Sequence, residues 1–119
     1  MALTRTVLQA ADALTGNGSS ADAGGANCVV FVGESAPTGA AGVLTFEVSV
    51  DEGTTWSLLA VTDALTGAAL AGSATAAARD GFAVIADDGL TGDCLVRARI
   101  STNWTTASPL VVAMVQRGS

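Results

Sequence analysis

The chain has 119 residues, half of them apolar, and its 11 acidic against 5 basic residues leave a net charge of −6. The length suits a single domain. The negative charge repels nucleic-acid phosphates, which argues against DNA or RNA as a partner. Apolar runs such as residues 28–32 and 110–115 are far too short to cross a bilayer, and residues 1–16 lack the continuous apolar segment of a secretion signal. We therefore expect no membrane association.

Residues 1–25 are predicted to form an N-terminal strand or arm that precedes the main domain, residues 26–119. Residues 4–9 show a weak two-residue alternation, and residues 10–25 are rich in glycine and small polar side chains, as in a loop. Residues 26–32 present apolar side chains on both faces. That pattern is typical of a central strand covered on both sides.

The segment 43–61 has the pattern of a β-hairpin. Between residues 43 and 50, apolar side chains alternate with Thr45, Glu47 and Ser49, so the strand is expected to bury its apolar face and expose the polar one. Asp-Glu-Gly at residues 51–53 fits a three-residue loop in which the first two residues are right-handed and the glycine is left-handed. Residues 54–61 are rich in β-formers and are expected to return as the partner strand.

The second half of the chain continues with strand patterns separated by turns. Residues 62–81 are rich in Ala and Gly and predict one long loop, or a short helix around residues 68–78. Strands are expected at residues 82–86, 93–101 and 110–117. Together the elements predict a mainly β fold, a single antiparallel β-sandwich or barrel-like domain of about seven strands.

A short motif, Asp-Ala-Leu-Thr-Gly, occurs at residues 12–16 and again at residues 63–67, with a near match at residues 88–92. The spacing is irregular, so the motif does not mark a repeat array. Its aspartate and its glycine exit predict a compact turn between elements. A calcium loop would need more carboxylates at fixed offsets.

The side chains that most enzymes use are missing from the composition. The chain has no histidine and no tyrosine, and all five basic residues are arginines. This removes the usual general base, the metal-binding imidazole and the Schiff-base amine. Asp51 and Glu52 are adjacent in a turn, where side chains diverge, and no third ligand is near in sequence. We expect no enzyme activity, no cofactor and no bound metal.

Cys28 and Cys94 each open an apolar strand pattern. They are expected to be buried thiols that pack as small apolar side chains. The alternative is a disulfide, within the chain or to a neighbouring one. Their spacing fits no zinc motif.

Three further residues are candidates for contact with a partner. Arg97 and Arg99 point outward from one predicted strand, where they either balance nearby carboxylates or supply ion pairs to another subunit. Trp104 lies in the connection before the last strand, where it either covers an end of the sandwich or anchors an interface.

The hairpin sequence EVSVDEGTTW at residues 47–56 resembles a pattern of small β-sandwich structural proteins of tailed bacteriophages. In that pattern a strand ending in Ser-x-Asp is followed by Gly-Thr-Thr-Trp. The matching residues here are Ser49, Asp51, Gly53, Thr54, Thr55 and Trp56. The likeness covers residues 43–61, and similar hairpins occur in carbohydrate-binding and fibronectin-like modules. The rest of the chain is similar in style to head decoration, or cement, proteins, which are short, acidic and rich in Ala, Gly, Thr and Val.

The resemblance implies a capsid decoration protein that binds the outer surface of the major capsid lattice and stabilises it, often as a trimer. It implies the major capsid protein as partner and the exterior of the virion capsid as location, after synthesis in the host cytoplasm. The arm, with Arg5, would then contact the capsid together with Arg97 and Arg99. A phage neck or tail structural protein is an alternative of the same class, and a carbohydrate-binding β-sandwich module is an alternative of another class.

Overall fold

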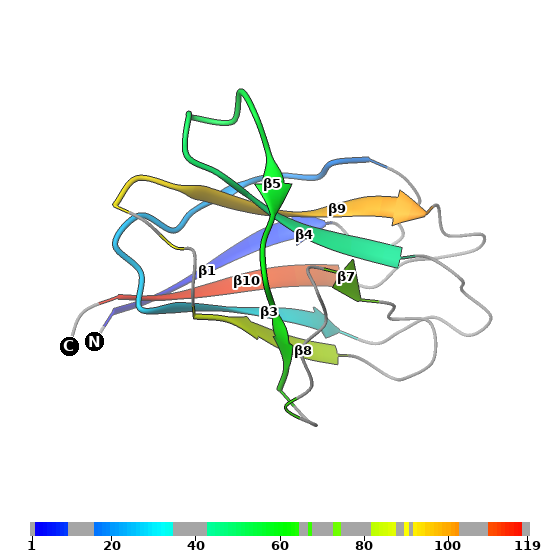
Figure 1. Cartoon of the computed structure of the whole chain (residues 1–119). Helices are drawn as coiled ribbons and strands as arrows, with labels where there is room; N and C mark the ends of the chain where they lie inside the picture. Colours follow the sequence, from blue (N-terminus) through cyan, green and yellow to red (C-terminus); the bar gives the residue numbers. More distant parts are fainter. Residues whose placement is uncertain are drawn as a thin grey trace.

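The computed structural model describes residues 2–9, 16–34, 43–64, 67, 73–74, 82–87, 90, 92–102 and 110–117. Within this part of the chain every regular element is a β-strand (Figure 1). The strands are β1 (Ala2–Gln9), β2 (Ala21–Asp22), β3 (Cys28–Glu34), β4 (Val43–Ser49), β5 (Ser57–Leu58), β6 (Thr62–Asp63), β7 (Ser73–Ala74), β8 (Phe82–Ala86), β9 (Leu95–Thr102) and β10 (Leu110–Arg117).

The strands form two antiparallel sheets that stack as layers (Figure 1). Sheet A has the order β1-β10-β3-β8-β6, and sheet B has the order β2-β9-β4-β5, with β7 also paired to β4. The prediction of a mainly β, antiparallel sandwich is confirmed. The described residues contain ten strands rather than about seven, because β2, β5, β6 and β7 are each only two residues long. None of the described residues belongs to a helix long and apolar enough to cross a membrane.

The N-terminal segment contributes to both sheets. β1 pairs with β10 from Ala2↔Arg117 to Val7↔Val112, and β2 pairs with the start of β9. The described residues of the predicted strand or arm, 2–9 and 16–25, are therefore integrated into the sandwich. We consequently expect that removing residues 1–20 would take an edge strand out of sheet A.

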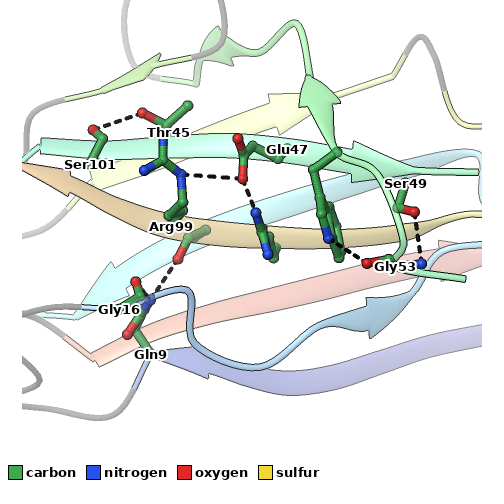
Figure 2. Close-up of polar contacts among 11 residues, drawn as sticks. Gln9, Gly16, Thr45, Glu47, Ser49, Gly53, Arg99 and Ser101 are labelled. Atoms are coloured by element: carbon green, nitrogen blue, oxygen red, sulfur yellow. Dashed lines mark hydrogen bonds and ion pairs between the residues drawn. The ribbon is translucent and has the colours of Figure 1, made fainter.

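Gln9 fastens the end of β1 to sheet B. Its buried side-chain amide donates to the carbonyl of Ala98 at 2.8 Å and to that of Gly16 at 3.1 Å (Figure 2). Gly18 passes so close that a Cβ there would lie 2.2 Å from the Leu8 carbonyl oxygen, and its φ is +68°. Only glycine meets both conditions without strain.

A single apolar core lies between the sheets. Phe31 of β3 and Phe46 of β4 meet across the layers with ring centroids 4.6 Å apart. Val96, Ala98 and Ile100 of β9 point into the same core, as the alternation in that strand predicts. Burial of each large apolar side chain contributes roughly 1.5–3 kcal/mol.

The predicted hairpin forms, but with a different turn and a shorter return strand. Glu47 pairs with Leu58, and Gly53 has the expected left-handed φ of 89°. The expected right-handed conformation of Glu52 is wrong, because its φ is 61°. The Asp51 carboxylate accepts bonds from the Thr55 backbone and hydroxyl, which folds residues 54–55 back toward the turn. Of the expected return strand, Ser57–Leu58 forms β5, and the Leu59 amide donates a further hydrogen bond to the Phe46 carbonyl of β4 at 2.9 Å.

The Asp-Ala-Leu-Thr-Gly motif closes a turn where both of its ends are described. The Gly67 amide donates to the Asp63 carbonyl at 2.8 Å, and the φ of Gly67 is 77°. This confirms the glycine exit predicted for residues 63–67. The helix considered around residues 68–78 is contradicted at Ser73–Ala74, which form β7, and its other residues lie outside the described part of the chain.

Candidate interaction surface

The outer face of sheet B carries a charged cluster built on the register of two central strands. β4 and β9 pair so that Glu47 lies opposite Arg97, and Thr45 lies opposite Arg99. Because side chains alternate across a strand, these four share the outer face, while Phe46 and its neighbours fill the core. The cluster thus follows from the same alternation that forms the core.

Glu47 binds both arginines (Figure 2). The Nε of Arg97 donates to the Glu47 Oε1 at 2.8 Å, and the Nε of Arg99 lies 3.5 Å from the same oxygen. The Glu47 and Arg97 side chains are 11% and 15% exposed, whereas Arg99 is 38% exposed. Two guanidiniums against one carboxylate leave the cluster one net positive charge, and the accessible part of it is on Arg99.

Trp56 covers the Arg97 side of the cluster. The Arg97 guanidinium lies 4.1 Å from the centre of the Trp56 ring, and the indole nitrogen donates to the Gly53 carbonyl at 3.1 Å. A cation over an indole face is worth about 0.5–2 kcal/mol, depending on how dry the site is. The Trp56 ring is therefore engaged within the chain.

The expectation that the polar face of β4 is exposed is wrong. Thr45, Glu47 and Ser49 are 7%, 8% and 1% exposed. Arg97, Arg99 and Trp56 share this side of sheet B, and each of the three β4 side chains has a polar partner there. Thr45 donates to the Ser101 hydroxyl at 2.8 Å, and the Ser49 hydroxyl accepts from the Gly53 amide at 2.8 Å (Figure 2).

An acidic cavity of about 570 Å³ lies next to this cluster, at the end of sheet B where the hairpin turns. We call it the acidic end. Its lining residues are Asp22, Ser49, Val50, Asp51, Glu52, Asp93, Cys94 and Leu95. Val50 was expected to face the core but is 65% exposed here, because β4 ends at Ser49. No group of three or more candidate ligands among the described residues could hold a metal ion.

Asp51 has a lowered pKa at the acidic end. Hydrogen bonds from the Thr55 hydroxyl and amide, and from the Ser49 hydroxyl, stabilise its carboxylate and lower its pKa from 3.8 to about 2. Asp51 therefore keeps its charge well into acid and organises the turn.

The candidate contact residues are distributed over different faces. Arg97 and Arg99 lie together on sheet B, where Glu47 binds both. Arg5 lies on the outer face of sheet A, opposite Met114, and is not near that pair in register. Trp104 lies outside the described residues.

Cys28 begins β3, Cys94 directly precedes β9, and the two cysteines are not bonded to each other. Cys94 is buried, whereas Cys28 is half-buried and its thiol donates to the Gln116 side-chain carbonyl at 3.3 Å.

Sequence reasoning missed Glu47 as the centre of the charged cluster. A carboxylate at an outward position of a strand is unremarkable in isolation. The useful signal was the pair of outward arginines two residues apart, which requires a counter-charge on a neighbouring strand. Finding that charge needs the pairing of β4 with β9, and sheet order is not readable from the sequence.

The fold is similar to that of SPBc2 prophage-derived protein YomS. Its crystal structure matches this chain with a TM-score of 0.75 at 14% identity, over 96% of this chain and 92% of the other. At that identity the likeness shows a shared fold. No protein-family model matches the chain, and no curated protein matches its sequence.

Proposed function

We propose that the chain is a structural protein of a tailed-phage virion, and specifically a capsid decoration protein that binds the outside of the major capsid lattice. The observation that carries the proposal is the fold, which is shared along almost the whole chain with a prophage-derived protein. The hairpin pattern at residues 47–56 and a composition without His, Lys or Tyr support the same reading. The protein would work as an oligomer and without catalysis.

The mechanism is association alone. A protein that binds only the assembled lattice stabilises it by RT ln(1 + [L]/Kd), where [L] is the free concentration of the decoration protein. If several copies are joined in one oligomer, the later contacts form at high effective concentration and raise the avidity. The proposed result of binding is therefore a more stable capsid shell, and no covalent bond is made or broken.

The acidic end is the surface that we assign to the capsid. It combines a hollow, several carboxylates and the exposed Val50, whereas the charged cluster beside it is largely satisfied by internal contacts. Glu52 and Asp93 are exposed there and can receive basic side chains of a partner. Complementary charge raises the association rate and sets the orientation of docking.

The test uses heads of the phage that encodes the chain, made without their own copy of it. Purified full-length protein is mixed with these heads and the particles are sedimented. We expect saturable binding at a fixed number of copies per head, and a higher temperature of head disruption. Absence of binding to heads overturns the decoration assignment. Binding to purified tails instead would place the protein in the neck or tail.

A pair of variants with matched charge tests the assigned surface. The double variant Glu52→Gln/Asp93→Asn raises the net charge by two and should weaken head binding at least about tenfold, which corresponds to about 1.4 kcal/mol. The control Ser57→Lys/Ala60→Lys raises the net charge equally at exposed positions away from the cavity lining. If both double variants weakened head binding equally, the effect would come from net charge in general, and the acidic end would not be the capsid-binding surface.

The carbohydrate-binding alternative gains no support from the described residues. A sugar-binding site would need an accessible aromatic face, and the Trp56 ring is already covered by Arg97. Sugar binding that survived in the Trp56→Ala variant but not in Trp104→Ala would restore this alternative.

A further inference from the structure

Three rows of side chains cross the middle of the outer face of sheet A, and the register continues beyond the first row with Leu110 opposite Glu34. Strand register and alternation place these residues together on one face. The first row is Val7, Val112, Val32 and Ala83; the second is Arg5, Met114, Val30, Ile85 and Thr62; the third is Leu3, Gln116 and Cys28. We call these twelve residues the apolar face.

The apolar face differs from the rest of the surface in its chemistry. Eight of its twelve side chains are hydrocarbon or thioether, a ninth is the Cys28 thiol, and Arg5 is its single charge. None of the twelve is a carboxylate, and the nearest acidic residues in register lie at the two ends of the face: Glu34 at the end of β3 and Asp87 directly after β8. Leu3 and Val7 are 61% and 40% exposed, and most of the other apolar members are half-buried. Contiguous apolar surface of this kind marks an interaction site.

The sequence of β3 indicates that a further layer packs on the outer face of sheet A. Its apolar run is typical of a strand covered on both sides, yet the side chains on its two faces are buried to different extents. Val29 and Phe31 are fully buried in the core, whereas Val30 and Val32 on the opposite face are only half-buried. β10 shows this asymmetry only in part: Met114 is half-buried, but Val112 on the same face is only 2% exposed.

We propose that the apolar face packs against the same face of a second copy of this chain. A flat sheet surface of Val, Ile, Ala and Met is the kind of surface that packs against another sheet about 10 Å away. In the dimer, sheet A of one copy would lie between its own sheet B and sheet A of the second copy, and the fold of each copy would stay the same. It goes beyond the proposed function, because it forms between free copies in the absence of a capsid.

The size of the face suits a weak, reversible contact. Strands about 4.8 Å apart and same-face residues about 6.7 Å apart give the twelve residues a footprint on the order of 400 Å². Two copies together bury on the order of 800 Å², at the low end of interface sizes. We therefore expect a weak dimer, with a dissociation constant in the micromolar range or above.

The distribution of charge favours a second copy over an unrelated acidic or basic partner. Two molecules that each carry −6 repel one another unless their carboxylates are kept away from the contact. The exposed carboxylates Asp22, Asp51, Glu52 and Asp93 lie in or next to the elements of sheet B, whereas the exposed Asp87 directly follows β8 and lies at the end of the apolar face. Arg5 lies on β1, the edge strand of sheet A, so the two copies of Arg5 can remain at the rim.

A contact of one face with itself is two-fold, so the proposal predicts a dimer rather than a trimer. The test is sedimentation equilibrium of the purified full chain from about 1 to about 500 µM, a range that brackets the expected dissociation constant. We expect the mass to rise from 11.6 kDa to twice that value. A monomer throughout, or a trimer, overturns the proposal.

Two variants on opposite sides of the face, Val7→Glu and Ile85→Glu, should each weaken dimerisation at least about tenfold, because a carboxylate would be buried against apolar side chains. The matched control Leu58→Glu changes a residue of sheet B that is 64% exposed and should leave the dimer intact. Dimerisation that is insensitive to both face variants, or equally sensitive to the control, overturns the assignment.

A second measurement needs no variant and remains valid if a face variant fails to fold. Cys28 belongs to the apolar face, whereas Cys94 is buried in the core. The rate at which a thiol reagent modifies Cys28 should fall as protein concentration rises, in proportion to the remaining monomer. A rate independent of concentration overturns the proposal. If heads then protect Cys28, the apolar face is a capsid contact instead.

Discussion

Replacing Glu47 by leucine should destabilise the protein by leaving two arginines without their counter-charge. Arg97 and Arg99 lie on the same face of β9. The Glu47 Oε1 is 2.8 Å from the Nε of Arg97 and 3.5 Å from the Nε of Arg99. Removing one partner of a fully buried ion pair costs about 3–5 kcal/mol. The Glu47 and Arg97 side chains are 11% and 15% exposed, and Arg99 at 38% can turn to water, so we reduce the expected cost to about 2 kcal/mol.

This cost converts into a measurable change in melting temperature. Unfolding entropy near the transition is about 2.1 cal/mol/K per residue. For 119 residues that gives roughly 250 cal/mol/K, so a loss of about 2 kcal/mol lowers Tm by about 8 °C. Circular dichroism melts supply Tm, and urea unfolding with an unchanged m-value shows that the loss lies in stability rather than in the compactness of either state.

The double variant Glu47→Leu/Arg97→Met separates the ion pair from the general effect of losing a carboxylate. It removes both charges, so it should be more stable than Glu47→Leu alone even though it also loses the contact with Trp56. The control Asp87→Asn removes a carboxylate from an exposed position and should change stability by less than about 0.5 kcal/mol. A Glu47→Leu variant that melts like Asp87→Asn, or a double variant less stable than the single one, refutes the reasoning.

Three other predictions concern the segments that position the two surfaces. Gly18→Ala should lower the free energy of unfolding by about 3 kcal/mol or more, because the new Cβ would clash with the Leu8 carbonyl and residue 18 has a positive φ. The control Gly92→Ala, which has open space around it, should leave the free energy of unfolding nearly unchanged in thermal melts. Gln9→Leu leaves the buried Ala98 carbonyl without its donor and should cost about 1–3 kcal/mol by urea unfolding. The pKa of Asp51 is lowered from 3.8 to about 2, so its carboxylate stabilises the fold above pH 3.8 and this contribution is lost as pH falls toward about 2. The Asp51→Asn variant should therefore lose less stability than the parent protein between pH 3.8 and pH 2. An equal loss in both proteins would contradict this prediction.

Much of the architecture could be predicted because half-buried strands reveal themselves by alternation. Positions 96, 98 and 100 are apolar and buried, whereas Arg97 and Arg99 face outward, as their order in the sequence indicates. Gly53 was likewise predictable, because few other residues adopt its left-handed conformation. These features depend on residues that are close in sequence.

The features that were missed depend on contacts between distant segments. The burial of Glu47 requires Arg97 from β9 and Trp56 from the return segment, and no local pattern reports either. The left-handed Glu52 departs from residue preference because the Ser49 and Asp51 side chains hold the turn from both sides. The integration of β1 into sheet A is also non-local, since its partner β10 lies at the other end of the chain.

The two outer faces of the sandwich explain how one small protein could bind both itself and a shell. On sheet B the polar side chains of β4 have partners within the chain, whereas the acidic end combines a hollow with exposed carboxylates that a partner can reach. On sheet A most apolar side chains of the apolar face are half-buried or exposed, in contrast to the fully buried core on the other side of the same strands. The two surfaces share no residue, so their effects should separate: Glu52→Gln/Asp93→Asn should weaken head binding and leave the dimer mass unchanged. Val7→Glu should dissociate the dimer and weaken head binding only because avidity is lost. The variant and the parent protein should therefore bind heads equally well at concentrations so low that both are monomeric. If each variant impaired both activities equally, the two surfaces would be one interface, and the separation of roles between the sheets would be wrong.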